Sequence, residues 1–256
     1  MGKMTASHIL ITGASSGLGA ALARLYAAPG MHLTLWGRNN ERLQAVAAVC
    51  RSKGADVETV TLDLHDVHAI EGHIDRSDDK RPIDIAIFNA GLGGITPQGR
   101  VVEHARRAFE VATTNFTAAA MAARTIAERM VKRKRGQIVL ISSVAESIPL
   151  PMSPTYAGSK AGLKMFAESL RIRVKPHGVS VTLASPGFID TPMSQQVTAD
   201  KPFMITPEKA ASILHRNITR RRKDFAFPWP YALVRKLFTW LPRFAQRAIV
   251  SRLPEE

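Results

Sequence analysis

A tyrosine and a lysine, four residues apart, are the pair of side chains in this sequence best suited to proton transfer. Tyr156 and Lys160 lie in the stretch PTYAGSK, which the pattern predicts to begin a helix, so both side chains share one face. A phenol titrates at about pH 10, and a nearby ammonium group favours the phenolate and lowers that pKa. Such a tuned phenol suits protonation of an alkoxide during carbonyl reduction. The alternative is two ordinary surface residues, because this spacing arises often by chance.

A glycine-rich turn near the start of the chain has the geometry of a phosphate-binding site. Residues 9–19 read ILITGASSGLG, which places an apolar run, a glycine-rich turn and a helix start in direct succession. Glycines let the backbone approach a ligand closely, and a helix N-terminus presents free N–H groups to an anion. The spacing TGxxxGxG differs from the commoner GxGxxG fingerprint, and the alternative interpretation is a tight turn between a strand and a helix.

The end of the second apolar run indicates which dinucleotide such a turn would hold. In NAD-binding members of dinucleotide folds, an acidic residue about 20 positions beyond the glycines accepts hydrogen bonds from the ribose hydroxyls. Here that place reads WGRN, with Arg38. A guanidinium group attracts the 2′-phosphate of NADP, whereas a carboxylate repels it, so we expect NADP(H) to be preferred, with NAD(H) as the alternative. The competing interpretation is a solvated cation at the start of a helix.

The elements that must position these residues follow from an alternation of short aliphatic runs with longer segments of helical spacing. This alternation predicts an α/β fold, with a Rossmann-type doubly wound parallel sheet of about seven strands and helices on both faces. The expected strands cover residues 8–11, 31–36, 57–62, 83–88, 137–141, 179–183 and 225–227, and the expected helices cover 18–28, 41–53, 67–74, 101–135 (in one or two pieces) and 155–175.

Taken together, these features make the chain similar to the short-chain dehydrogenase/reductase (SDR) family, in its NADP-preferring type. The TGxxxGxG turn has the spacing of the family's cofactor turn, and further matches follow in the family's order. Asp63 in TLDL resembles the acid that hydrogen-bonds adenine, and NAG at 89–91 resembles the stretch after the fourth strand. Asn115 resembles the helix asparagine of the active site, and PG at 186–187 resembles the turn after the sixth strand.

The resemblance implies an enzyme that interconverts a carbonyl and a secondary alcohol by hydride transfer. In that role Tyr156 supplies the proton, Lys160 tunes it and holds the nicotinamide ribose, and Asn115 supports a water relay to the lysine. Ser143, thirteen residues before the tyrosine, corresponds to the serine that polarises the substrate oxygen, with Ser142 as the competing candidate. The residues implied to contact the cofactor are Gly13, Ser15, Ser16, Gly17, Leu18, Gly19, Arg38, Asp63, Leu64, Asn89, Ala90, Gly91, Tyr156, Lys160, Pro186, Gly187, Ile189 and Thr191.

The same resemblance and the composition along the chain predict how its domains are organised. Nothing rich in Gly, Ser or Pro divides the chain before residue 186, so we expect residues 1–227 to form a single Rossmann-type catalytic domain. Its specificity region is expected at about 190–224, because this part varies within the family. Residues 228–256 are expected to form a helical, amphipathic and basic C-terminal extension. A homo-oligomer, either a dimer or a tetramer, is the state that the family implies.

Composition and charge restrict where the protein acts. The single cysteine, Cys50, excludes an intramolecular disulfide, and the first residues lack the apolar core of a secretory signal, so we expect a cytoplasmic protein. No apolar run approaches the length of about 20 residues that spans a bilayer. The formal net charge is +14, and residues 201–256 hold 12 Lys or Arg against 4 Asp or Glu. More than half of the excess charge therefore lies in the last quarter of the chain.

The C-terminal extension departs from the family pattern, in which many members end in a glycine-rich segment that packs on a partner subunit. After PWPY come apolar residues at helical spacing with cations on other faces, and we expect Pro242 to split them into two short helices. The extension is expected either to pack over the substrate cleft or a second subunit, or to lie at the inner face of a membrane with Trp229, Trp240 and Phe244 inserted. Either apolar neighbourhood predicts a lipophilic carbonyl or alcohol substrate.

Three other functions are disfavoured by the sequence. His65 and His68 lie close to Asp63 and Asp66, but the acid has an adenine role in the resemblance and the implied chemistry needs no metal, so no metal site is expected. The run KRKR at 132–135 precedes Gly136, as cations at a helix end do, and no nucleic-acid-binding motif accompanies it. An NADP(H)-binding regulator on the same scaffold is the alternative function, although such proteins commonly lack the tyrosine or lysine that this chain keeps.

Overall fold

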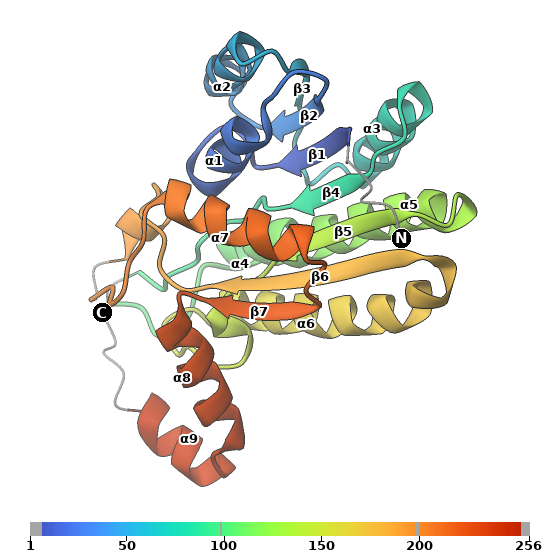
Figure 1. The fold of residues 1–256 in the computed structure, drawn as a ribbon. Coiled ribbons are helices and arrows are strands. Elements are labelled where there is room, and N and C mark those ends of the chain that lie inside the picture. Colours follow the sequence, from blue (N-terminus) through green and yellow to red (C-terminus); the bar gives the residue numbers. More distant parts are fainter. Residues whose placement is uncertain (1–6, 98, 198–199, 252–256) are drawn as a thin grey trace.

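Seven parallel strands form one sheet, which confirms the predicted Rossmann-type fold (Figure 1). The computed structural model of the protein describes residues 7–97, 99–197 and 200–251. The strand order is β3-β2-β1-β4-β5-β6-β7, so the direction of winding reverses between β1 and β4. The strands are β1 (His8–Thr12), β2 (His32–Gly37), β3 (Asp56–Thr61), β4 (Ile85–Phe88), β5 (Gly136–Ile141), β6 (Val179–Pro186) and β7 (Asp224–Phe227).

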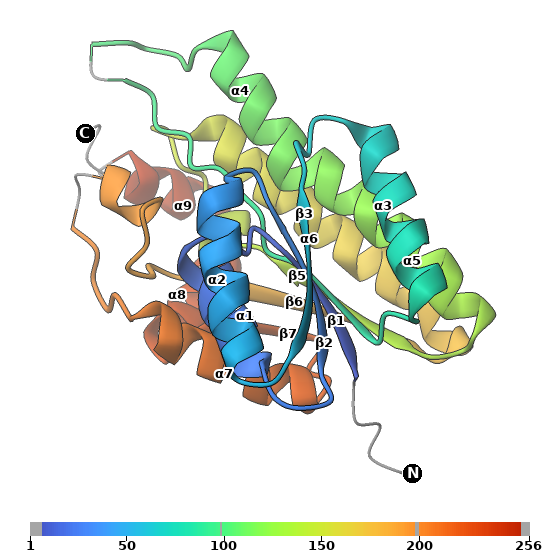
Figure 2. The same ribbon diagram turned by 90° about the horizontal axis from the view of Figure 1, so that it is seen from above.

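Helices cover both faces of the sheet (Figure 2). One layer contains α1, α2 and α7, and the opposite layer contains α3, α4, α5 and α6. A π-helical turn, η1, joins α4 to α5 without a break in the helix. The bounds are α1 (Gly17–Tyr26), α2 (Asn40–Ser52), α3 (Val67–Lys80), α4 (Ala105–Ala112), η1 (Thr113–Ala118), α5 (Ala119–Lys132), α6 (Pro154–Val174) and α7 (Pro207–Thr219).

The core is divided by the sheet into two apolar clusters. In β1, Ile9 and Ile11 pack against the layer of α1, α2 and α7, and Leu10 between them packs against the opposite layer. All three side chains are buried, as the two-residue period of a strand covered on both faces requires. Burial on both faces explains why the strands read as continuous aliphatic runs, and it fixes the register of every strand relative to the cavity at their carboxyl ends.

The structure contains one helix in the specificity region that the sequence analysis did not predict. α7 begins with Thr206 as its N-cap, whose side chain accepts a hydrogen bond from the amide of Lys209, and Pro207 occupies the first helical position. Leu214 and Ile218 point into the core beside α1. The cap, the proline and the apolar spacing together are the signal that could have identified this helix.

The third helix is longer than predicted, because its polar end is held by ion pairs. α3 continues from the expected end at Ile74 to Lys80, through a charged stretch without apolar periodicity. Asp78 there accepts hydrogen bonds from Arg129 at 2.6 Å and from Arg133 at 2.8 Å, both at the end of α5, and from the amide of Ile83 at 2.8 Å. The polar stretch thus remains helical through tertiary contacts.

The expected C-terminal extension forms two helices, α8 (Trp229–Trp240) and α9 (Arg243–Val250), which we call the C-terminal arm. The helices separate at Pro242, as predicted. The arm follows the edge strand β7 and extends away from the sheet (Figure 1). Within the part of the chain that the structure describes, no helix has both the length and the apolar character needed to cross a bilayer. Residues 252–256 of the expected extension lie outside the described residues.

We predict that Asp78→Asn lowers the free energy of unfolding by about 3 kcal/mol, because it leaves the partly buried Arg133 without its carboxylate and removes the most buried of the three carboxylates that pair with Arg129. Burial alone would raise the pKa of Asp78, but the hydrogen bonds from Arg129 and Arg133 outweigh it and hold the pKa below the ordinary 3.8. The stabilisation is therefore present above that pH and is lost as pH falls through the lower folded pKa. Urea denaturation at neutral and acid pH measures both effects.

Asp79 provides the matched control on the same helix. Its side chain is 67% exposed, against 4% for Asp78, and it pairs with the same Arg129. Asp79→Asn should cost at most about 1 kcal/mol, because exposed ion pairs contribute little. Equal losses for the two variants would contradict the role assigned to the buried carboxylate.

Candidate active site

A cavity of about 1390 Å³ lies at the carboxyl ends of the central strands, where the strand order reverses. This is the position at which open α/β sheets bind ligands, and the volume exceeds that of typical small-molecule pockets. Of the catalytic and cofactor-binding residues that the sequence predicts, all but Gly19 and Asn115 line it. The cavity brings together Gly13, Ser15, Ser16, Gly17, Leu18, Arg38, Asp63, Leu64, Asn89, Ala90, Gly91, Ser143, Tyr156, Lys160, Pro186, Gly187, Ile189 and Thr191.

The glycine-rich turn presents the free N-terminus of α1 to this cavity. Ser16 is the N-cap of α1, and its side chain makes no capping hydrogen bond. The first N–H groups of α1 and the positive end of its dipole are thus available to an anion. This arrangement fits the pyrophosphate of a dinucleotide cofactor.

Two glycines of the turn are required by close packing. Gly13 has a φ of +68°, and a Cβ atom there would lie 2.8 Å from the Cα atom of Ala90. A Cβ atom on Gly19 would lie 2.2 Å from the carbonyl oxygen of Gly13. Gly19 therefore supports the turn from behind, and any side chain at these positions would push the turn away from β4.

The far end of the cavity carries two cations, one of which the sequence analysis did not identify. Arg38 follows β2 and is exposed, and Arg42 lines the same region from the first turn of α2. Asn39 caps that helix by accepting a hydrogen bond from the amide of Arg42 at 2.8 Å. The cap thus brings both guanidinium groups to the mouth of the cavity. Its signal in the sequence was the asparagine directly before the helix.

Asp63, on the opposite wall, has an exposed carboxylate. Its Oδ1 atom accepts a hydrogen bond from the amide of His65 at 3.0 Å and lies 3.0 Å from Nδ1 of the same histidine. His65 was part of the group considered for a metal. Over the described residues, no cluster of three or more His, Cys, Asp or Glu side chains is placed to hold a metal ion.

The two candidate serines follow β5, and their hydroxyl groups have different partners. Ser142 Oγ donates to the carbonyl oxygen of Lys160 at 3.4 Å, which ties the end of β5 to α6. Ser143 starts the short 3₁₀ turn η2 (Val144–Glu146) and accepts a hydrogen bond from the amide of Ala145 at 3.2 Å. The Ser143 hydroxyl group also interacts with the Tyr156 side chain, and this contact with the tyrosine favours Ser143 over Ser142 as the residue that contacts substrate.

Tyr156 and Lys160 lie on one face of α6, as the four-residue spacing predicted. Lys160 is buried, donates a hydrogen bond from Nζ to the carbonyl oxygen of Ile141 at 3.0 Å, and lies 5.8 Å from the centre of the Tyr156 ring. Burial lowers the pKa of Lys160 to about 8, against the opposing charge of Glu146. Part of the lysine is consequently neutral slightly above neutral pH.

The sequence-based expectation that Lys160 lowers the pKa of Tyr156 is wrong for this structure. Burial raises the pKa of Tyr156 above its ordinary 10, and only the neighbouring Ser143 side chain acts in the opposite direction. Desolvation disfavours both the phenolate and the ammonium ion, and it is the largest cause of both pKa shifts. Tyr156 is thus a phenol at neutral pH, the protonation state that a general acid needs.

Asn115 lies behind the cavity in the π-helical turn η1. Its side chain forms a reciprocal pair with Leu92, accepting from the amide at 2.7 Å and donating to the carbonyl oxygen at 2.9 Å. It also donates to Ser159 Oγ at 3.3 Å. Such π-turns occur frequently at functional sites. Asn115 therefore holds the loop after β4 against α6 and so shapes the wall opposite Tyr156.

An ion pair that no sequence pattern indicated connects the site to the C-terminal arm. The Glu146 side chain is fully buried, and Oε1 accepts a hydrogen bond from Arg235 of α8 at 2.8 Å, while Oε2 accepts from Ser185 at 2.8 Å. Arg235 also forms two hydrogen bonds of 3.0 Å with Asp224. Burial raises the pKa of Glu146, and its hydroxyl and guanidinium partners oppose that rise.

The first turn of α8 also closes one side of the cavity. The Tyr231 ring packs so closely on Gly187 that a Cβ atom there would lie 2.2 Å from the ring, and Tyr231 Oη donates to the carbonyl oxygen of Pro202 at 2.5 Å. The cavity lining near this point is largely apolar: Ile95, Ile148, Leu150, Met152, Phe188, Met193 and Tyr231. Most of these residues were not identified from the sequence.

Comparisons with known proteins agree with this geometry. A family model described as short chain dehydrogenase matches residues 7–202. The chain is 34% identical to an uncharacterized oxidoreductase of Myxococcus xanthus, over 99% of this chain and 100% of that one. It is 36% identical to the dehydrogenase/reductase SDR family member 7B of Bos taurus, over 97% of this chain and 82% of that one.

A solved structure provides the same comparison in three dimensions. A short-chain dehydrogenase from Sphingobium yanoikuyae in complex with NADPH superimposes with a TM-score of 0.80 at 28% sequence identity. The match covers 96% of each chain. The similarity therefore extends into the region of the C-terminal arm.

We predict that Arg235→Met destabilises the protein by about 3 kcal/mol at pH 8, because Glu146 is left buried without its cation. The pKa of Glu146 then rises further above its value of 4.5 in the unfolded chain. A raised folded pKa gives stability that is complete below the unfolded pKa and is lost as pH rises through the folded one. In urea denaturation, the free energy of unfolding that Arg235→Met loses relative to the unmodified protein should hence be smaller at pH 5 than at pH 8.

Two variants serve as controls for this prediction. Lys236→Met removes an adjacent, exposed cation and should change stability by no more than about 0.5 kcal/mol. In the double variant E146Q/R235M no buried carboxylate remains, so the extra dependence on pH should disappear. A deficit that is the same at both pH values, or one shared by Lys236→Met, is incompatible with the proposed pairing.

Proposed function

The chain belongs to the short-chain dehydrogenase/reductase family, and from this premise we propose that it interconverts a carbonyl and a secondary alcohol with NADP(H) as the hydride carrier. As a member of this family it is an oxidoreductase. The observation that carries the proposal is that Ser143, Tyr156 and Lys160 meet in one cavity that continues to the glycine-rich turn and to Arg38. A proton donor, a polarising hydroxyl group and an anion-binding helix terminus therefore face the same space.

The residues of the cavity suit a dinucleotide at one end and a carbonyl at the other. NADPH supplies a hydride when bound and NADP accepts one in the reverse direction. Reduction then adds that hydride to the carbonyl carbon and one proton to the oxygen. Tyr156 donates the proton, Ser143 donates a hydrogen bond to the oxygen, and Lys160 anchors the site through Ile141 and holds the ribose hydroxyls.

Two arginines support the preference for NADP(H). Arg38 and Arg42 both line the end of the cavity beyond β2, where the adenosine ribose is expected. Arg38 occupies the place at which NAD-binding folds carry an acidic residue. Two guanidinium groups can share a phosphate through charge-assisted hydrogen bonds. The structural neighbour from Sphingobium yanoikuyae is described in complex with NADPH, which agrees with this preference.

The substrate that fits the remaining space is lipophilic. The part of the cavity next to Tyr156 is bounded by apolar side chains from the loop after β4, the loop after η2 and the first turn of α8. Burying apolar substrate surface there contributes about 25 cal/mol of favourable binding free energy per Å². A carbonyl or alcohol with a substantial hydrocarbon portion is the class we propose.

We predict that Tyr156→Phe lowers turnover of a carbonyl substrate by at least about 100-fold, because the phenol is the proton donor. Binding of NADPH, measured by its fluorescence, should be largely unchanged. The control is Tyr26→Phe at the carboxyl end of α1. This variant removes a buried hydroxyl group that has no hydrogen-bond partner. An active Tyr156→Phe enzyme in a panel of lipophilic ketones and alcohols, followed by NADPH absorbance, would refute the assignment.

We predict that Arg38→Gln lowers kcat/KM for NADPH by about 10- to 100-fold, the value of a charge-assisted hydrogen bond. The value for NADH should change little, because NADH lacks the 2′-phosphate. Arg24 lies in the last turn of α1, at the end away from the glycine-rich turn, and Arg24→Gln should leave both kcat/KM values unchanged. A parallel loss with both dinucleotides would indicate that Arg38 supports the fold rather than the phosphate.

A further inference from the structure

The helix α8 has one face packed on the protein and one apolar face in water. Arg235 is fixed by Glu146 and Asp224, and Phe238 is buried on the same side. On the other side, the side chains of Trp229 and Trp240 are 76% and 81% exposed. Four of the exposed apolar residues of α8 share one side of the helix, and we call them the arm stripe: Trp229, Leu233, Leu237 and Trp240.

The arm stripe is a continuous surface, since its four residues share one side of the helix. At 3.6 residues per turn they fall within an arc of about 80°. The buried Glu146 cannot lose Arg235 without leaving an unpaired charge, so α8 cannot rotate to hide the stripe. The contacts that attach the arm to the catalytic domain thus force two tryptophans outward.

Cations surround the arm stripe. Lys236 on α8 lies with its Nζ atom 5.8 Å from the centre of the Trp240 ring, and α9 exposes Phe244 together with Arg243 and Arg247. α9 is held against the end of α8 by hydrogen bonds from Gln246 to the carbonyl oxygens of Phe238 and Leu241. Residues 201–251 contain 11 Lys or Arg and only 2 Asp or Glu.

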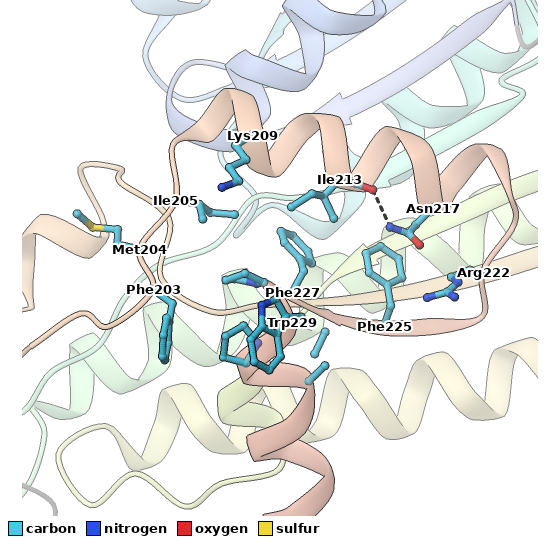
Figure 3. A pocket seen from close by; sticks show the side chains of 14 residues that line it. Phe203, Met204, Ile205, Lys209, Ile213, Asn217, Arg222, Phe225, Phe227 and Trp229 are labelled. Atoms are coloured by element: carbon cyan, nitrogen blue, oxygen red, sulfur yellow. Dashed lines mark hydrogen bonds between the residues drawn. The ribbon is translucent and has the colours of Figure 1, made fainter.

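A second cavity, of about 620 Å³, continues this surface onto the catalytic domain (Figure 3). Phe225, Phe227 and Trp229 contribute aromatic side chains to it, so Trp229 belongs to both the cavity and the arm stripe. Lys209 on α7 and Arg222 in the turn after α7 add cations to the lining. The cavity lining therefore combines aromatic and cationic side chains, as the arm does.

We propose that the arm stripe and its surrounding cations bind the interface of an anionic lipid bilayer, at the cytoplasmic surface that the sequence predicts. Tryptophan is suited to this position, because its ring is apolar and its N–H group can remain hydrated. The arm is too short and too charged to cross a bilayer, so it lies in the plane of the interface. Lys236, Arg243 and Arg247 then face the lipid phosphates.

Charge distinguishes this occupant from the two others that such a surface could take. A second copy of the chain would bring two strongly positive surfaces together, and opposed like charges cost several kcal/mol at an interface. A nucleic-acid duplex would match the cations but would leave the arm stripe in water, because its surface presents phosphates and sugars, and the aliphatic Leu233 and Leu237 offer no stacking surface to the bases of a single strand. A bilayer of anionic lipids, in contrast to both, offers negative headgroups and an apolar layer at the same boundary.

The experiment uses the protein's own tryptophans as reporters on the full chain. Trp36 is buried and should not respond, whereas Trp229 and Trp240 should shift to shorter emission wavelength when lipid covers them. The protein is mixed with phosphatidylcholine vesicles, with or without phosphatidylglycerol, and sedimented. We expect retention on the vesicles that contain phosphatidylglycerol, a blue shift on the same vesicles, and a decrease of both at high salt.

Variants separate the apolar and the cationic contributions. W229S/W240S should lower the partition coefficient at least about 10-fold, because it removes two large apolar rings from the interface. W229F/W240F should keep retention but lose the blue shift. Each of Lys236→Gln, Arg243→Gln and Arg247→Gln should lower the partition coefficient about fivefold on anionic vesicles. All these side chains are exposed, so circular dichroism should remain unchanged.

Matched controls come from the carboxyl end of α6, outside the arm. Ile172 is 76% exposed on α6, and Arg173 and Lys175 are exposed beside it. Ile172→Ser and the double variant R173Q/K175Q remove similar apolar and cationic groups outside the arm, so they should not affect retention of the protein on vesicles. A nonspecific attraction of the basic protein to any anionic surface would weaken equally in these controls, and that result overturns the proposal.

Two further outcomes also overturn it. If vesicles never retain the protein but duplex or single-stranded DNA does so through the same cations, the surface binds nucleic acid. The other outcome is that vesicles do not retain the protein, that the protein sediments as a dimer, and that the W229S/W240S variant sediments as a monomer. The arm stripe then binds a second copy of the chain. None of these assays uses turnover, so the result is independent of whether the proposed reaction is correct.

Discussion

The hydrogen bond from the Lys160 ammonium group to the carbonyl oxygen of Ile141 is the contact on which the arrangement of the site depends. It joins the catalytic face of α6 to the carboxyl end of β5, so the helix cannot rotate without leaving a buried charge unsatisfied. A charge in this position is costly, and the lowered pKa of Lys160 records that cost. The rigid sheet thereby fixes Tyr156 relative to Ser143, which the same strand carries at its end.

Glu146 extends this electrostatic arrangement to the C-terminal arm. Its carboxylate lies near Lys160, whose pKa it raises in part, and it is paired directly with Arg235. Ser185, which donates to the same carboxylate, precedes the turn at Pro186 and Gly187 that lines the cavity. One buried acid therefore connects the serine loop, the cofactor side of β6 and α8, and the arm is part of the architecture of the site rather than an appendage.

What could be predicted from the sequence was local, and what could not was long-range. The turn at residues 12–19 and the pair at 156 and 160 are specified by residues near one another in the chain, so their spacing, together with the resemblance to the family, predicted that they belong to one site. Arg235 and Glu146 are 89 positions apart, and no periodicity links them. Likewise α3 continues past Ile74 because Arg129 and Arg133 reach it from α5. The direction of the Tyr156 pKa was wrong for the same reason, since burial is a property of the whole fold.

The adjacent residues Arg235 and Lys236 show how the arm can serve two surfaces at once. One turn of α8 directs the arginine to a buried carboxylate and the lysine toward Trp240 and solvent. An arginine suits the inner position because its planar group can bond Glu146 and Asp224 together, and a lysine suits the outer one because its charge stays hydrated on a flexible stem. Tyr231, on the inner face, lines the catalytic cavity. If the outer face lies on lipid, the apolar part of the cavity that Tyr231 lines is near the bilayer, where a lipophilic substrate is most concentrated. The apolar lining and the basic arm are then two consequences of the same helix.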